Sequence, residues 1–154
     1  MPRNRQSEAR KQAVLGLVWH RIGPTQRKHP TRPDWHVSKD ESVEVFITDS
    51  KSTDKHAPWY DMRKTDIDEL ASRPAAFIIF ILGDQSRYLV APASQIAAQL
   101  QKHSPPTDNG FYHFHIVRGK SEFKEFPAWN IKPYVDNMSQ IPLQVTFGNR
   151  EAAN

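Results

Sequence analysis

The apolar run at residues 75–82 constrains the fold more than any other part of the sequence. It reads Ala-Ala-Phe-Ile-Ile-Phe-Ile-Leu without a polar residue, and it lies between Pro74 and the pair Gly83-Asp84. A continuous apolar run of this length, bounded by residues that interrupt regular structure, is typical of a strand that is buried on both faces. We therefore predict that residues 75–82 form a central strand, with other elements packed on both sides of its sheet.

Residues 34–51 predict a hairpin next to this strand. Val43, Val45 and Ile47 recur at every second position, which is the period of a strand. Residues 34–38 form a shorter candidate strand, and the polar residues 39–42 form a turn between the two. Side chains two positions apart leave a strand on the same face, so Asp49 and Lys51 would lie together.

The pair Pro33-Asp34, followed by Asp49-Ser50-Lys51, resembles the PD-(D/E)xK signature of the restriction-endonuclease-like nucleases. A competing register takes Glu44 as the second acidic residue, but it places Phe46 where the lysine should be. The resemblance covers residues 7–100. It implies an α/β (α+β) fold, in which a central mixed β-sheet is flanked by helices, and here an extra C-terminal strand and a wrap would follow the restriction-endonuclease-like core.

The resemblance also implies a site and a reaction. Asp34 and Asp49 would hold Mg²⁺ or Mn²⁺, since carboxylate oxygens suit these cations. Lys51 would orient the attacking water or stabilise the transition state, and Glu8 of the first helix would reach the metal, although helix capping explains Glu8 equally well. The implied activity is that of a Mg²⁺-dependent endodeoxyribonuclease, which hydrolyses DNA phosphodiester bonds in restriction, defence or repair.

Positive charge is concentrated at the start of the chain. Residues 1–33 contain eight Lys and Arg against the single acidic residue Glu8, a net charge of +7, whereas the whole chain carries +4. Such a segment favours a polyanionic partner, DNA above all, although a solubilising tail is the alternative for the first six residues. The candidate phosphate contacts are Arg10, Lys11, Arg21, Arg27, Lys28 and Arg32, with His36 and Lys64 as second-tier candidates.

The remaining elements follow from periodicity and turn residues. A helix is expected at residues 7–19 with Ser7 as N-cap and Ala13, Val14, Leu17 and Val18 on its buried face. Residues 25–33 are expected to form a basic loop without core residues. Further elements are a helix from a capping box at 65–68, a strand at 87–91 beside the central strand, a helix at 94–102 that buries Ile96, Ala97 and Leu100, and a strand at 111–117.

Length and composition restrict the protein class. The 154 residues predict a single domain, with flexible ends at 1–6 and 148–154. The absence of cysteine excludes disulfides, thiolate chemistry and zinc–cysteine sites. No apolar run approaches the roughly 20 residues of a membrane-spanning helix, so we expect a cytoplasmic protein with no membrane partner. A homodimer stays open at this level.

Other interpretations stay open at the level of the sequence. The gap between Asp34 and Asp49 is long for the resembled family, and it would also fit a non-catalytic nucleic-acid-binding or protein-interaction module with a decayed site. A third possibility is an interaction subunit of a defence or toxin system that has no enzymatic activity. His113 and His115 could ligate a transition metal or be polar surface. Trp59 and Tyr60 could stack on a base or close the core, and the core interpretation is preferred.

Overall fold

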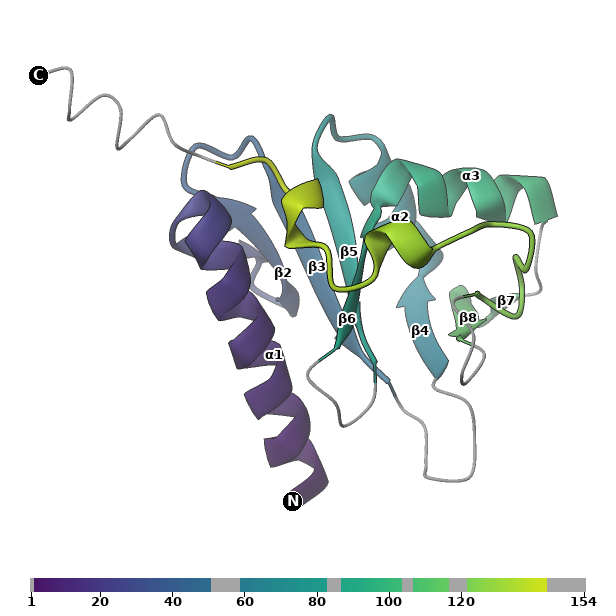
Figure 1. Cartoon of the computed structure of the whole chain (residues 1–154), viewed down its shortest axis with the longest axis horizontal. Coiled ribbons are helices and arrows are strands. Elements are labelled where there is room, and N and C mark those ends of the chain that lie inside the picture. The colour runs from purple at the N-terminus through teal and green to yellow at the C-terminus, as the bar shows by residue number, and fades with distance from the viewer. Residues whose placement is uncertain (1, 51–58, 83–86, 104–106, 117–121, 144–154) are drawn as a thin grey trace, which may run out of the picture.

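A five-stranded mixed sheet forms the centre of the protein in the computed structural model, which describes residues 2–50, 59–82, 87–103, 107–116 and 122–143 (Figure 1). Its strands lie in the order β1 (Thr25–His29), β2 (Arg32–Ser38), β3 (Glu44–Asp49), β5 (Ala76–Ile81) and β6 (Tyr88–Pro92). The β3–β5 pair is parallel and the other pairs are antiparallel. The predicted mixed sheet with flanking helices is therefore confirmed.

The predicted central strand is β5. All six of its residues are buried, and they divide between two hydrophobic clusters on the two faces of the sheet. β3 lies beside it in register, with Val45 opposite Phe77 and Ile47 opposite Ile79, and β6 returns antiparallel on its other side. The expected hairpin is present as β2 and β3, with Lys51 outside the described residues, and the expected return strand is confirmed.

The helix α1 (Pro2–Ile22) covers one face of the sheet. It begins before the predicted start, so Ser7 lies inside the helix and does not cap it. The predicted buried stripe is also partly wrong, because Leu17 is 44% exposed and Ala13 is exposed. Residues 13–19 are apolar around most of the helix, so periodicity allows several stripes. The sheet selects the one formed by Val14, Leu15, Val18 and Ile22.

The predicted basic loop at residues 25–33 is wrong. Residues Thr25–His29 form the edge strand β1, which pairs with β2 so that Arg27 lies opposite His36. The strand was missed because its residues are polar and give no hydrophobic alternation. An edge strand of charged residues is a common arrangement, since charge discourages pairing with another chain.

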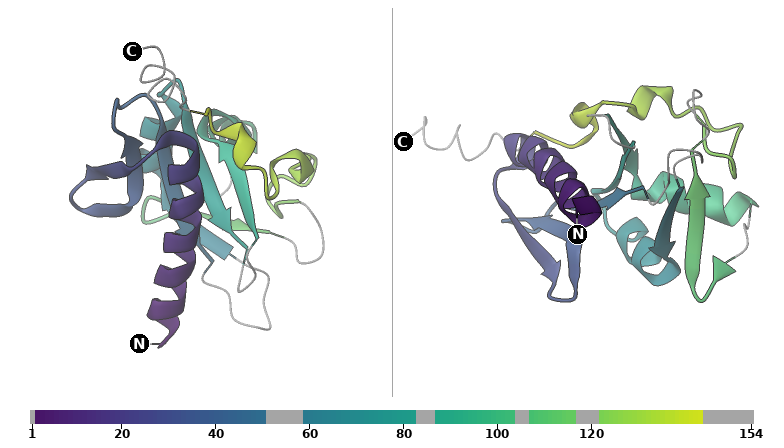
Figure 2. Two further views of the ribbon diagram at one scale, coloured as in Figure 1. Left: turned by 60° about the vertical axis from the view of Figure 1, so that its left-hand side comes forward. Right: turned by 90° about the horizontal axis from the view of Figure 1, so that it is seen from below.

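The second face of the sheet is covered by α2 (Lys64–Ala71), α3 (Ala93–His103) and a small antiparallel sheet (Figure 2). The small sheet contains β4 (Trp59–Arg63), β8 (Phe111–His115) and β7 (Thr107–Asp108). The strand expected at 111–117 corresponds to β8, whereas β4 was not predicted. Tyr60 of β4 is fully buried and donates its hydroxyl to the Ile81 carbonyl oxygen at 2.6 Å, which confirms the core interpretation for that residue.

The helices α2 and α3 each start one residue before the predicted position. α2 starts at Lys64, one residue before the expected capping box, and its N-cap residue Arg63 makes no side-chain cap. The Lys64 amide instead donates to the Gly110 carbonyl oxygen at 2.8 Å, a tertiary contact that local sequence does not reveal. α3 begins at Ala93, and it buries Ile96 and Leu100 as expected, with Ala97 only partly buried.

The segment 122–143 crosses the molecule and includes two short 3₁₀ helices, η1 (Lys132–Tyr134) and η2 (Met138–Gln140) (Figure 2). Phe123, Phe126 and Ile131 enter the core beside α3, and Ile141 enters the core beneath α1. The expected wrap over the domain is thus present, while the predicted flexible end at 148–154 lies outside the described residues. Among the residues that the structure describes, no helix is long and apolar enough to span a membrane.

Candidate active site

Asp34 and Asp49 lie on neighbouring strands and both face α1. The pairing of β2 with β3 ends with Trp35 opposite Phe46, and the next residue of each strand, Asp34 and Ile47, lines the pocket beneath α1. Asp49 follows two residues later, on the same face of β3 as Ile47. Asp34 and Asp49 are therefore on the same side of the sheet, and each contacts α1 through one of two consecutive residues of that helix.

Each of these carboxylates forms an ion pair with α1. The Arg10 guanidinium donates to Oδ2 of Asp49 from Nε at 3.0 Å and from Nη2 at 2.7 Å. Lys11 Nζ lies 3.1 Å from Oδ2 of Asp34. The side chain of Asp49 is only 3% exposed, whereas that of Asp34 is 32% exposed. One turn of α1 therefore neutralises both acidic residues.

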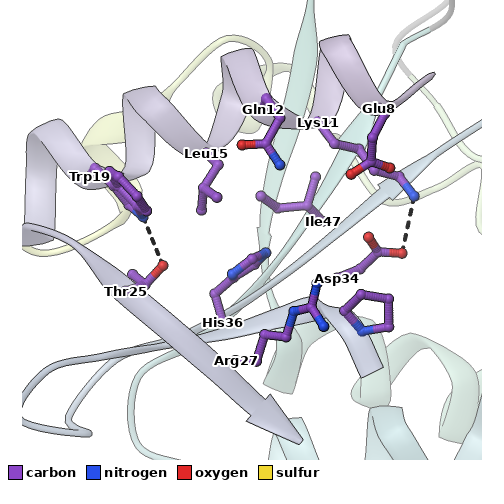
Figure 3. Close-up of a pocket in the computed structure, with 11 residues that line it drawn as sticks. Glu8, Lys11, Gln12, Leu15, Trp19, Thr25, Arg27, Asp34, His36 and Ile47 are labelled. Atoms are coloured by element: carbon purple, nitrogen blue, oxygen red, sulfur yellow. Dashed lines mark hydrogen bonds and ion pairs between the residues drawn. The ribbon is translucent and has the colours of Figure 1, made fainter. Parts of the chain in front are cut away.

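A pocket of about 210 Å³ lies between α1 and the β1–β2 hairpin (Figure 3). Glu8, Lys11 and Asp34 lie at one end of it, and His36 is near its middle. At the other end the Trp19 indole donates to Thr25 Oγ1 at 2.8 Å. The complete lining is Glu8, Lys11, Gln12, Leu15, Trp19, Thr25, Arg27, Pro33, Asp34, His36 and Ile47.

Comparison with protein-family models, curated proteins and solved structures finds no match for this chain.

The surroundings of His36 favour its neutral imidazole form. Burial lowers the pKa of the His36 imidazole, Asp34 acts in the opposite direction, and Arg27 lowers the pKa further. A neutral imidazole can both donate and accept a hydrogen bond. His36 therefore supplies the pocket with an uncharged polar group between the acidic end and the Trp19 end.

The competing register with Glu44 as the second acidic residue is incompatible with the structure. Glu44 projects from β3 on the face opposite Asp49, and its Oε1 accepts a 3.0 Å hydrogen bond from the buried Trp35 indole. Its Oε2 lies 3.2 Å from Arg73 Nε and 3.6 Å from Lys28 Nζ. Glu44 is thus a buried anchor on the α2 side of the sheet, away from Asp34.

The predicted phosphate-binding residues are distributed over several surfaces. Arg10, Lys11 and Arg27 belong to the α1 side, at or near the pocket. Other members of the set have different contacts. Lys28 reaches Glu44, Arg32 lies 3.2 Å from Asp66, Lys64 lies 2.8 Å from Asp68, and Arg21 donates to the Ile141 carbonyl oxygen at 2.8 and 3.1 Å.

The donor chemistry of Asp34 and Asp49 fits a hard divalent cation. Mg²⁺ is commonly bound by one or two carboxylates, with water and substrate phosphate completing its coordination. Within the described ranges, no group of three or more acidic or histidine side chains is arranged to hold a metal. Any ion at this site must therefore compete with Arg10 and Lys11 for two carboxylates. Lys51 lies outside the described residues.

The alternative transition-metal pair lies elsewhere, on β8. His115 Nδ1 is 2.7 Å from Oε2 of Glu125, and the His113 ring centroid lies 5.9 Å from that of Trp59. His115 thus contacts the 122–143 segment, and His113 packs against Trp59 of β4.

Sequence reasoning missed Gln12, Leu15, Trp19 and Thr25 as lining residues. Glu8, Lys11, Gln12, Leu15 and Trp19 follow one another at intervals of three, one, three and four residues, which is the spacing of one helical face. This spacing indicates which face of the helix lines the pocket. The predicted buried stripe was based on apolar residues alone and was therefore shifted by one residue.

Proposed function

We propose that this protein is a metal-dependent nuclease that hydrolyses DNA phosphodiester bonds, with its reaction centre at Asp34 and Asp49. One observation supports the proposal above all: the two acidic residues lie on one face of adjacent strands, beneath a helix that contributes both acidic and basic side chains. Metal-assisted attack on a phosphate needs carboxylates that hold the divalent cation and basic side chains that stabilise the charge developing on the phosphate.

Asp34 and Asp49 would hold the divalent cation through their carboxylate oxygens. A bound Mg²⁺ or Mn²⁺ supplies Lewis-acid polarisation of the phosphate and of a water. Glu8, at the rim of the pocket, would accept a hydrogen bond from that water and orient it. Lys51 follows Asp49 by two residues and would stabilise the negative charge that develops on the phosphate.

The first prediction concerns Asp49. Cleavage of DNA should require Mg²⁺ or Mn²⁺, and Asp49→Asn should lower its rate by at least about 100-fold, the usual scale for losing a group that stabilises the transition state. Asp68→Asn is a matched control, because Asp68 is an exposed carboxylate on α2 that pairs with Lys64. The rate of cleavage of a supercoiled plasmid by each purified variant is the measurement.

A second function is favoured by a different observation. Arg10 and Lys11 already neutralise both acidic residues, as they would in a binding module whose site has lost catalysis. Such a module would bind DNA without cutting it. If the wild-type protein binds DNA but leaves the plasmid intact in Mg²⁺ and in Mn²⁺, the binding module replaces the nuclease. Full activity in Asp49→Asn would place the chemistry at another site.

A further inference from the structure

Arg10 and Lys11 contact the two carboxylates that the proposed function assigns to a metal. Arg10 Nη2 lies 2.7 Å from Oδ2 of Asp49, and Lys11 Nζ lies 3.1 Å from Oδ2 of Asp34. The Asp49 carboxylate also accepts the Ser50 amide through Oδ1 at 2.8 Å. A carboxylate that is almost fully buried needs a nearby positive charge, and in this structure Arg10 provides it.

These contacts and a bound divalent cation exclude one another. A cation on Oδ2 of Asp49 would lie within a few ångströms of a guanidinium that donates to the same oxygen, and like charges at that distance repel strongly where little water screens them. The same argument applies more weakly to Lys11 and Asp34, since Asp34 is 32% exposed and water screens part of the repulsion. Binding of the cation to these two oxygens therefore requires both side chains to give up their contacts.

Phosphate groups of the substrate can become the new partners of the released side chains. Arg10 and Lys11 are about one quarter and one fifth exposed, and Lys11 lines the pocket together with Arg27 (Figure 3). Long flexible stems let both charged groups move by several ångströms while the helix stays in place. A phosphate brought in with the substrate would replace the lost carboxylate partner, and the planar fork of Arg10 suits two phosphate oxygens.

We infer that Arg10 and Lys11 exchange partners during binding. Without a divalent cation they neutralise Asp49 and Asp34, and with the cation bound they contact the phosphates of DNA. Metal and DNA therefore bind cooperatively, since each relieves a cost of binding the other. The inference rests on the proposed function, because it takes Asp34 and Asp49 as the metal ligands.

The test is a calorimetric titration of the protein with Mn²⁺ in the absence of DNA. Lys11→Gln and Arg10→Gln each remove a competitor for the carboxylates, so each should lower the dissociation constant for Mn²⁺ by at least about fivefold, the lower end of typical coupling between sites. Arg5→Gln is the matched control, because it removes one positive charge from an exposed position on the same helix. It should change the constant by less than about twofold, since exposed charges are largely screened.

Stability of the variants provides a second readout. Arg10→Gln leaves the buried Asp49 carboxylate without its cation, so the variant should unfold at a lower temperature than the wild type. Mn²⁺ should raise its Tm more than it raises that of the wild type. Lys11→Gln keeps the test valid if Arg10→Gln does not fold, because Asp34 is partly solvated and needs its partner less.

Cooperativity is tested on the Lys51→Ala background, in which we expect slow cleavage. Adding a short DNA duplex should tighten Mn²⁺ binding, and the gain should disappear when Arg10→Gln and Lys11→Gln are combined. Suppose that Asp49→Asn removes Mn²⁺ binding but Arg5→Gln, Lys11→Gln and Arg10→Gln bind Mn²⁺ equally well. The partner exchange is then wrong, while the metal site of the proposed function stands. If Mn²⁺ binds no variant, or binds Asp49→Asn as well as wild type, the metal site of the proposed function fails too.

Discussion

Asp49 and Glu44 are two buried carboxylates of β3, and their surroundings differ in kind. Glu44 accepts the Trp35 indole N–H and lies near Arg73 and Lys28, so its contacts join the β1–β2 hairpin to the turn that follows α2. Asp49 faces the opposite side of the sheet and contacts a single long side chain of α1, that of Arg10. A network of several partners is difficult to rearrange, whereas a single ion pair can be exchanged. This difference suits Glu44 to a structural role and Asp49 to ligand binding.

His36 makes the stability of the folded protein depend on pH. Its pKa is lowered by burial, so the unfolded state takes up the proton at a higher pH than the folded state does. The unfolded state binds more protons below about pH 6.5, the ordinary histidine pKa, and stability therefore falls as the pH falls. Above that pH the neutral imidazole contributes its full stabilisation.

We expect His36→Gln to reduce this acid sensitivity. Between pH 7 and pH 5.5 the free energy of unfolding of the wild type should fall more steeply than that of the variant, by at most about 1.4 kcal/mol per pH unit for one proton. Urea unfolding at several pH values, followed by tryptophan fluorescence, measures both slopes. Parallel slopes would show that His36 titrates alike in the folded and unfolded states.

At the scale of elements, local pattern was sufficient where a strand is apolar. The strands β3 and β5 carry continuous or alternating apolar residues, and both were predicted together with their pairing. β1 and β4 were missed for different reasons. β1 is polar throughout, and β4 pairs with β8, some fifty residues later in the chain, so only the tertiary structure supplies its hydrogen-bond partners.

The site was predictable to a similar extent. The positions of Asp34 and Asp49 follow from alternation along two strands, but the partners of these residues do not. Arg10 and Lys11 looked like free basic residues, because nothing local indicates which turn of α1 lies over the end of β3. Lys28 and Arg32 looked equally available, and the partners that engage them, Glu44 and Asp66, come from other elements.

The C-terminal segment 122–143 stabilises the position of α1. Ile141 is fully buried against the α1 side of the sheet, and its carbonyl oxygen accepts two hydrogen bonds from Arg21. Ile141→Ala should lower the free energy of unfolding by about 3 kcal/mol, through lost burial and the cavity that remains. Leu143→Ala should cost less than about 0.5 kcal/mol, since Leu143 is 51% exposed. Chemical denaturation measures both.

A smaller difference between these two variants would weaken the assigned role of the segment. Because α1 supplies Arg10 and Lys11, which compete with the cation for Asp49 and Asp34, we also expect Ile141→Ala to tighten Mn²⁺ binding, while Leu143→Ala leaves it unchanged.

At the scale of the whole molecule, the sheet divides the positive charge of the first third of the chain. Arg10, Lys11 and Arg27 are on the α1 side, next to the candidate active site. Lys28 and Arg32 are on the α2 side, where Glu44 and Asp66 neutralise them. Arg27 and Lys28 are consecutive residues of β1 and point to opposite faces, as strand alternation requires. Arg32 lies at the start of β2, where the pairing with β1 is irregular, and its side chain reaches Asp66. Under the proposed function, DNA should therefore approach from the α1 side.

Arg27→Gln and Lys28→Gln test this directly, because the two variants have the same net charge and adjacent positions. Each phosphate contact contributes about 0.9 to the slope of log K against log salt on duplex DNA. Arg27→Gln should make the slope shallower by about that amount, and Lys28→Gln should leave it unchanged. Binding is measured by fluorescence anisotropy in EDTA, where the proposed cleavage cannot proceed and Arg10 and Lys11 still hold their carboxylates. Equal changes in the two variants would mean that DNA responds to net charge and not to one face, and a change in Lys28→Gln alone would place the duplex on the α2 side.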